Sequence, residues 1–408
     1  MQAADLALQR NKYKHLSYDE WRWFLQQVEG RERTADKLPA FAAIDEWWYP
    51  VRLSCEQCSS ELTAKYKASL LSSFIFHPSS LLDLTGGYGV DTYFLSEHFE
   101  HTDYVEQNAE LCRIAEHNFS LPTPSHPNGK GICIHHSTAE EFLSNDKRQT
   151  TNDLFDLIYL DPYRRDSHGG KVFRLEDCMP NVVELLPVLL QHLTPDGRLM
   201  LKLSPMLDLT QALKTLAVSH SPLAFDVHVV AVRNEVKEVL LLSRPQSALS
   251  HQTTITAVDL SKKDQAFVFT REEEASLTVQ RSYSETVLQQ SGLTGVVGLY
   301  IYEPNAAILK AGAYKLVAQR FGLAKLDVNT HLYASDTLLN NFPGRVWRIN
   351  SQFTIHNSQI EHANVLTRNY PLTPEQLKKK YRLKDGGDLY LIGCRVNGKP
   401  MLFVANRI

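Results

Sequence analysis

Between residues 80 and 245, short apolar runs alternate with stretches of helical spacing. Five of these runs have the length of buried strands: Leu81–Leu84, Thr102–Glu106, Gly131–His135, Leu154–Leu160 and Gly197–Leu203. Such alternation is typical of strand–helix units wound around a parallel sheet. Two later runs, Phe225–Val232 and Glu238–Leu242, flank a short polar turn. They predict a hairpin added at the end of this sheet.

Residues 1–75 have helical spacing. Ser17 stands at a possible N-cap, with Glu20 at the capping-box position three residues later. Four of the five tryptophans lie in this region: Trp21, Trp23, Trp47 and Trp48. We expect them to pack the helices onto the next domain; the alternative is that they stack on nucleic-acid bases.

The last third of the chain mixes strands and helices. Strand-like runs at Ile255–Leu260, Ala266–Thr270 and Gly295–Ile301 precede one helix expected over about Asn305–Phe321. A second helix is expected to begin at Pro374 and to end in Lys378, Lys379 and Lys380. The sequence thus predicts four parts: an N-terminal helical region over 1–75, a Rossmann-like domain over 76–245, a segment over 246–340 and a small α+β unit over 341–408.

Composition changes this picture little. Hydrophobic residues make up 43% and charged residues 22% of the 408 residues, as in globular proteins, and no apolar run approaches the roughly 20 residues that span a bilayer. The N-terminus lacks the apolar core of a signal peptide. Six cysteines without a disulfide framework predict reduced thiols and a cytoplasmic location, and we read Cys55 and Cys58 as small apolar side chains.

Charge is unevenly distributed along the chain. The net charge is −3, but residues 361–408 carry nine Lys or Arg against four Asp or Glu. A basic end on an acidic body favours a module that faces phosphate groups.

The most informative segment is Leu81–Gly89, where an apolar strand ends in Asp83 and a turn containing Gly86, Gly87 and Gly89 follows. Glycines let the backbone approach a ligand closely. The next strand ends in Glu106, 23 residues after Asp83, where a carboxylate can accept both ribose hydroxyls of an adenosine.

The glycine spacing excludes the dinucleotide fingerprint G-x-G-x-x-G, and no Lys-Ser/Thr pair follows as in a P-loop. S-adenosylmethionine (SAM) has no phosphate, and its ammonium group suits Asp83. We therefore predict a SAM site that also includes Thr85 and, after the third strand, Ser137 and Thr138. The alternative is a glycine turn that serves packing only. His135 and His136 lack a third ligand at suitable spacing, so we read them as strand-end packing and predict no metal site.

The fourth strand ends in Asp161-Pro162-Tyr163. Here the chain resembles class I SAM-dependent methyltransferases that act on exocyclic base amines, whose motif is Asp/Asn-Pro-Pro-aromatic. The resemblance implies catalytic roles for Asp161, Pro162 and Tyr163, with the acid accepting hydrogen bonds from the amine of a flipped-out base. The chain departs from the motif at Tyr163 and at Arg164, so Arg164 and Arg165 are candidates for holding phosphate instead.

The whole chain is similar to a bacterial group of class I methyltransferases that carry a C-terminal THUMP-like domain. The resemblance is also carried by Asp83–Thr92, Tyr104–Asn108, Asp161–Lys171, Tyr302–Gly312 and Lys380–Gly387. It implies an α/β fold: a Rossmann-like class I methyltransferase sheet with an N-terminal helical region and C-terminal α+β domains, ferredoxin-like and THUMP-like. THUMP domains bind RNA, which agrees with the basic C-terminal end.

The sequence therefore predicts a SAM-dependent RNA methyltransferase that acts on guanine N2 or adenine N6 of rRNA or tRNA, with Arg164, Arg165, Lys378, Lys379 and Lys380 on the RNA. Three alternatives stay open: a DNA adenine methyltransferase, a non-catalytic RNA-binding module with a SAM fold, and a methyltransferase of proteins or small molecules. No metal and no membrane partner are expected.

Overall fold

The computed structural model describes residues 3–72, 79–123, 129–145, 154–164, 174–219, 223–244, 252–262, 266–278, 299–353 and 360–408. The chain divides into two compact units. The first contains Met1–Asp226 and Glu238–Gln252, and the second contains Val227–Lys237 and Thr253–Ile408. The division runs through the hairpin formed by β8 (Phe225–Val232) and β9 (Glu235–Ser243).

A parallel sheet forms the centre of the first unit. Its strands are β1 (Ser80–Asp83), β2 (His101–Glu106), β3 (Cys133–His136), β4 (Phe155–Leu160) and β7 (Leu193–Leu203). They lie in the order β7-β4-β1-β2-β3, each parallel to its neighbours, and β9 pairs antiparallel with β7. A short antiparallel pair, β5 (Tyr163–Arg164) and β6 (Cys178–Met179), lies beyond β4. The predicted Rossmann-like sheet is confirmed.

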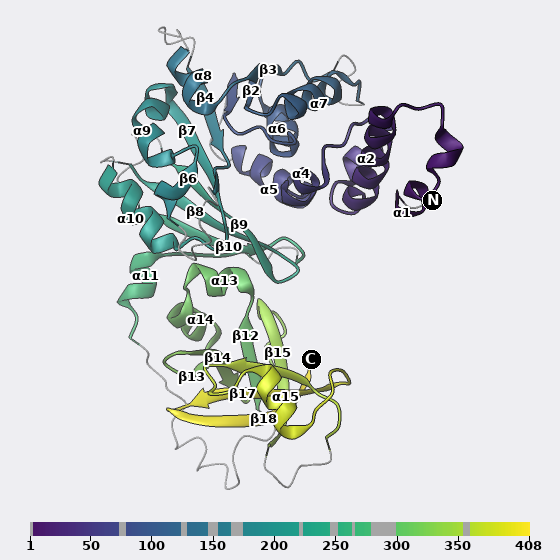
Figure 1. Ribbon diagram of the computed structural model, residues 1–408. Coiled ribbons are helices and arrows are strands. Elements are labelled where there is room, and N and C mark those ends of the chain that lie inside the picture. The colour runs from purple at the N-terminus through teal and green to yellow at the C-terminus, as the bar shows by residue number, and fades with distance from the viewer. Residues whose placement is uncertain are drawn as a thin grey trace. The chain divides into compact units, whose positions relative to one another are not determined.

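Helices cover both faces of this sheet. In Figure 1, α8 (Ala139–Asn145), α9 (Val182–Gln191) and α10 (Leu209–Ser219) lie on one face, and α6 (Val90–Leu95) and α7 (Ala109–Ser120) lie on the other. Short 3-10 turns, η2 (Ser96–His98) and η4 (Leu175–Asp177), join these elements. Asn108 caps α7 through its side chain and thereby fixes the turn that follows β2.

The N-terminal region is helical, as predicted. It contains α1 (Ala3–Ala7), η1 (Arg10–Tyr13), α2 (Tyr18–Thr34), α3 (Pro39–Ala42), α4 (Arg52–Gln57) and α5 (Glu61–Leu71). Ser17 and Glu20 form the predicted capping box of α2. Trp47 is buried, stacks on Phe41 with ring centroids 4.1 Å apart and donates a hydrogen bond to the hydroxyl of Tyr88. The packing role expected for the tryptophans is thus confirmed for Trp47, while Trp23 and Trp48 pack at the margin of the same core.

The hairpin is not the end of the sheet, contrary to the sequence prediction. Within the second unit, β10 (Thr254–Asp259) pairs parallel with β8, and β11 (Phe267–Thr270) pairs antiparallel with β10, so strands follow the hairpin among the described residues. One face of β8 is apolar (Phe225, Val227, Val229 and Ala231), and β9 pairs with only one edge of the strand, so the other edge is open to β10. A capping box at Thr270 and Glu273 begins α11 (Arg271–Ser276).

The rest of the second unit is built on a seven-stranded sheet. Its strands, in spatial order, are β13 (Ala324–Asp327), β14 (Thr330–Ser335), β12 (Tyr300–Pro304), β15 (Gly344–Gln352), β18 (Lys399–Arg407), β17 (Leu389–Val396) and β16 (Asn364–Arg368). Thr373 caps α15 (Pro374–Tyr381), whose last turn carries the three lysines, as predicted. The single helix expected over 305–321 is wrong. It is two helices, α13 (Ala306–Ala311) and α14 (Tyr314–Phe321), because Gly312 takes a φ of +85° and ends the first.

Among the described residues, no helix combines the length and the apolar character that crossing a bilayer requires.

Candidate active site

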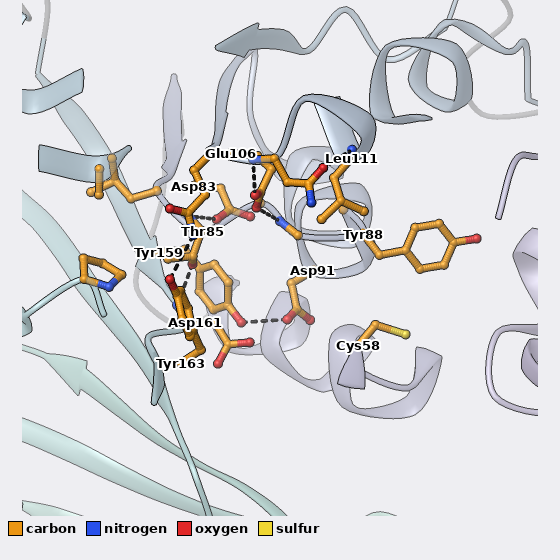
Figure 2. Close-up of a pocket in the computed structure, with 18 of the residues that line it drawn as sticks. Cys58, Asp83, Thr85, Tyr88, Asp91, Glu106, Leu111, Tyr159, Asp161 and Tyr163 are labelled. Carbon is orange, nitrogen blue, oxygen red and sulfur yellow. Dashed lines mark hydrogen bonds between the residues drawn. The ribbon is translucent and has the colours of Figure 1, made fainter. Parts of the chain in front are cut away.

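A cavity of about 350 Å³ opens at the carboxyl ends of β1, β2 and β4 (Figure 2). Ligands of open α/β folds bind at this edge. Ten of the residues predicted as site residues line the cavity: Asp83, Thr85, Gly86, Gly87, Gly89, Glu106, Ser137, Thr138, Asp161 and Tyr163. Segments far apart in the sequence, the glycine loop and the Asp-Pro-Tyr segment, therefore border one space.

Glycine is needed at Gly86 and at Gly87 for different structural reasons. A β-carbon on Gly86 would lie 2.1 Å from the ring of Tyr104, so this position must be glycine for the loop to pack on β2. Gly87 has a φ of +56°, and the nearest atom to a β-carbon there would be 3.8 Å away. Packing therefore explains Gly86, whereas Gly87 leaves open space beside the cavity that a ligand can approach.

The carboxylate of Glu106 is held by two backbone amides. It accepts hydrogen bonds from Gly87 N at 2.8 Å and from Asn108 N at 2.7 Å. Tyr104 donates to the carbonyl of Gly87 at 2.6 Å, which fixes the loop from the same strand. Because each carboxylate oxygen can accept more than one hydrogen bond, Glu106 can still accept hydrogen bonds from the hydroxyl groups of a ligand.

Asp83 is buried at the end of β1. Its carboxylate accepts hydrogen bonds from Thr85 N at 3.0 Å and from Thr92 Oγ1 at 2.5 Å. Burial raises the pKa of Asp83 to about 7, against the opposing effect of these two hydrogen bonds. A cationic ligand group would favour the ionised form of this carboxyl.

Asp161 lies beside Thr85 of the glycine loop at the carboxyl end of β4. Its backbone N–H donates to Thr85 Oγ1 at 2.6 Å, and the parallel register pairs Asp83 with Tyr159 two residues before it. The side chain of Asp161 is 38% exposed and lines the cavity. Tyr163 is half exposed, and its hydroxyl accepts a hydrogen bond from Gln107 Nε2 at 3.0 Å. Figure 2 shows Asp83, Thr85 and Asp161 gathered on one side of the cavity.

Sequence reasoning missed a set of buried and nearly buried charged residues that is joined to Asp161 through Lys202. We call Lys67, Asp91, Lys202 and Glu238 the charge network. Lys202, on β7, forms an ion pair with Asp161 and lies 3.9 Å from Asp91. Lys67, on α5, is fully buried and bonds both oxygens of Glu238 at 2.7 and 2.8 Å and Asp91 at 3.1 Å. The sequence contained one indication of Lys202, because a charged residue is unusual inside the apolar run Leu201–Leu203. It contained no indication that Lys67 is buried, because lysines are common in stretches of helical spacing.

The hydroxyls of Ser59 and Tyr159 complete the network by donating to Asp91 at 2.7 and 2.6 Å. Burial raises the pKa of Asp161, and the ammonium of Lys202 opposes that rise. For Lys202, burial works to lower the pKa, but Asp161, Asp91 and Glu238 outweigh it and raise the pKa. Lys202 is therefore a permanent cation beside Asp161.

The remaining predicted residues lie elsewhere. Pro162 is buried and is not among the residues that line the cavity. For Arg164 only the backbone, in β5, is described, and Arg165 lies outside the described residues. Lys378, Lys379 and Lys380 lie on α15 in the second unit, where Lys379 and Lys380 are exposed and Lys378 pairs with Asp385 at 2.6 Å.

The parallel sheet, the glycine loop after β1 and the acidic end of β2 define a class I methyltransferase domain. Family models agree for the C-terminal part: residues 300–343 match a ferredoxin-like domain, and residues 344–407 match a THUMP-like domain. No curated protein sequence gives a significant match.

One solved structure resembles nearly the whole chain. It is a crystal structure from Porphyromonas gingivalis W83, named as that of a candidate methyltransferase, with 32% identity, a TM-score of 0.76 and coverage of 96% of this chain and 92% of that chain. The chain therefore belongs to this family of SAM-dependent methyltransferases with ferredoxin-like and THUMP-like C-terminal domains.

Two more distant structures match less than half of the chain. A candidate methyltransferase from Streptococcus mutans in complex with SAH has 13% identity, a TM-score of 0.32 and coverage of 44% of this chain and 96% of that chain. An rRNA methylase from Streptococcus thermophilus has 14% identity, a TM-score of 0.31 and coverage of 44% and 94%.

Proposed function

We propose that this protein is a SAM-dependent RNA methyltransferase that acts on an exocyclic base amine, guanine N2 or adenine N6, of rRNA or tRNA. The observation that carries the proposal is the position of Asp161. Its carboxylate lines the same cavity as the glycine loop, and its backbone is bonded to Thr85 of that loop. A methyl donor and an amine held in this cavity would lie within reach of each other.

SAM would occupy the cavity with its ribose on Glu106 and its ammonium group towards Asp83. Gly86, Gly87, Gly89 and Thr85 would form the wall behind the amino-acid part of the cofactor. Ser137 and Thr138, which line the cavity beyond β3, would border the adenine. This arrangement uses carboxylates for the hydroxyl and ammonium groups and needs no phosphate site.

Asp161 would accept a hydrogen bond from the substrate amine. Lys202 pairs with Oδ2 of the carboxylate, which leaves Oδ1 for the amine. The nitrogen lone pair attacks the methyl carbon, the carbon–sulfur bond breaks, and sulfur keeps the electron pair as S-adenosylhomocysteine forms. The proton then leaves the nitrogen for Asp161 or solvent. Lys202 is a positioning residue in this scheme, because it keeps Asp161 ionised and oriented.

RNA would be held outside the cavity. Tyr163 is exposed at the cavity edge, where its ring could stack on a base, and Arg164 and Arg165 follow it in the sequence. The THUMP-like domain, with Lys378, Lys379 and Lys380, would contact phosphates. The six cysteines form no disulfide among the described residues, which agrees with a reducing, cytoplasmic place of action.

The test is methyl transfer from tritiated SAM to total RNA and to genomic DNA, each freed of the other by nuclease treatment. The proposal expects label in RNA alone, and label in DNA alone would favour the adenine-specific DNA enzyme. Mass spectrometry of nucleosides from a deletion strain would then identify the base. If neither nucleic acid is labelled and SAM does not shift the melting temperature, the protein is a binding module rather than an enzyme.

A further inference from the structure

Outside the cavity, four side chains with metal-binding atoms meet on one face of the sheet: His101 and Asp103 of β2, and Cys133 and His135 of β3. Along the sequence the two pairs lie 30 residues apart, so spacing alone did not suggest a site. The parallel register places Asp103 directly opposite Cys133. Because alternate residues share a face, His101 and His135 lie on the same side.

Three of these residues offer ligand atoms close together. His101 Nε2, an Asp103 oxygen and Cys133 Sγ all lie within 4.8 Å of one another, and His101 Nε2 is 3.1 Å from Asp103 Oδ2. Zinc binds His and Asp at about 2.0–2.2 Å and Cys at about 2.3 Å, so ligand atoms of a tetrahedral site lie roughly 3–4 Å apart. The group needs only small side-chain rotations to close on an ion.

The fourth residue orients the first three. His135 Nε2 lies 2.6 Å from Asp103 Oδ1, the oxygen that His101 does not use, and its ring contacts Phe142 with centroids 4.9 Å apart. Asp103 is buried, whereas His101 and Cys133 are exposed. Carboxylates that bind a metal ion are themselves held by hydrogen bonds from outer-shell groups, and His135 would hold Asp103 in this way.

The geometry points to a zinc-binding site formed by His101, Asp103 and Cys133, with His135 as the positioning residue and solvent in the fourth position. The donor set of one thiolate, one imidazole and one carboxylate suits zinc better than magnesium or calcium. A thiolate and a carboxylate together balance the two positive charges of the ion. The site lies towards the start of β2, away from the Glu106 end that faces the cavity, so it is separate from the proposed methyl-transfer chemistry.

The test uses the full chain without an affinity tag, freed of metal by a chelator. Titration calorimetry should show about one Zn²⁺ per chain. Co²⁺ should give the thiolate charge-transfer band and the visible bands of a tetrahedral site. Cys133→Ser should remove the thiolate band, and His101→Ala should weaken zinc binding. His135→Ala should weaken it by about 10–100-fold, as expected for an outer-shell partner.

His98→Ala is the matched control, because His98 is an exposed histidine three residues before His101. It should bind zinc as the parent does, and cooperative thermal unfolding should show that every variant is folded. The inference is overturned if the parent binds no zinc, or if Cys133→Ser and His101→Ala bind it as tightly as His98→Ala. In that case Asp103 and the two histidines form a hydrogen-bonded array and nothing more.

Discussion

The two halves of the cavity are built in different ways. The half that we propose for the cofactor comes mainly from the chain between Asp83 and Asn108, and hydrogen bonds join its carboxylates to backbone amides of that stretch. The half that we propose for the methyl acceptor contains Asp161, which pairs with Lys202 of the charge network, whose members come from α5, α6, β7 and β9. Local bonds fix the first half, and tertiary packing fixes the second. Substitutions should therefore damage the two halves in distinguishable ways.

The largest effect is expected at Asp161. Asp161→Ala should lower methyl transfer by about 10²–10⁴, the usual worth of a positioned acid–base group, because the amine is left without its acceptor. SAM affinity should stay near the parent value, since Asp161 faces the substrate. Radiometric assays with parallel calorimetry measure both. Asp161→Asn keeps an acceptor oxygen and should retain partial activity. Parent-rate transfer by Asp161→Ala would place the catalytic site elsewhere.

Lys67 should matter for stability. Lys67→Met leaves Asp91 and Glu238 buried without their shared cation, which should cost about 3–5 kcal/mol in the free energy of unfolding. Urea denaturation followed by circular dichroism measures this decrease. Lys65→Met is the matched control, because Lys65 is exposed on the same helix and its pair with Glu61 should contribute about 0.5 kcal/mol or less. Equal stability of the two variants would contradict the importance of the network.

Glu106→Ala tests the cofactor half. Removal of the charged hydrogen bonds to the ribose should weaken SAM binding by about 1.5–3 kcal/mol. The charge network is untouched, so activity at saturating SAM should recover more than in Asp161→Ala. Calorimetry gives the affinity, and unchanged SAM binding would rule out the ribose interaction.

The pH dependence of SAM binding should report Asp83. Its pKa is raised to about 7 by burial, so the free protein holds a proton there below pH 7. The ammonium group of SAM favours the ionised carboxylate, and affinity should fall by about tenfold per pH unit as the pH drops below 7. Calorimetry in buffers of different ionisation enthalpy should detect the released proton. In Asp83→Asn the dependence should vanish.

The smallest effect concerns the second unit. Replacing Lys378, Lys379 and Lys380 by Ala should flatten the log–log salt dependence of RNA binding by about 0.7–0.9 for each phosphate that the variant no longer neutralises. Filter binding over a salt series gives the slope. SAM affinity should not change, because these lysines belong to the other unit. An unchanged slope would mean that α15 does not hold RNA.

The same division explains what the sequence could predict. Local sequence patterns predict the strands and the glycine loop, because strand ends and turns favour particular residues. They also predict that Asp83, Glu106 and Asp161 lie together, because the carboxyl ends of parallel strands meet at one edge. The charge network was not, since Lys67 and Glu238 lie 171 positions apart. The break at Gly312 was missed because a glycine inside a helical pattern also permits an unbroken helix. The pairing of β10 with β8 was not predicted, because the pattern of apolar and polar residues shows where a strand forms but not which strand it pairs with.

The separation between Lys67 and Glu238 also bears on how the protein is made. A ribosome must synthesise β9 before Lys67 can pair with Glu238, although α5 and Asp91 leave the exit tunnel long before. Until then, Lys67 and Asp91 lack the carboxylate of Glu238, and burial of a partly paired charge is unfavourable. The glycine loop, by contrast, closes with residues made soon after it. During synthesis, the cofactor half can thus form early, while the acceptor half is completed only when the chain has grown past residue 238.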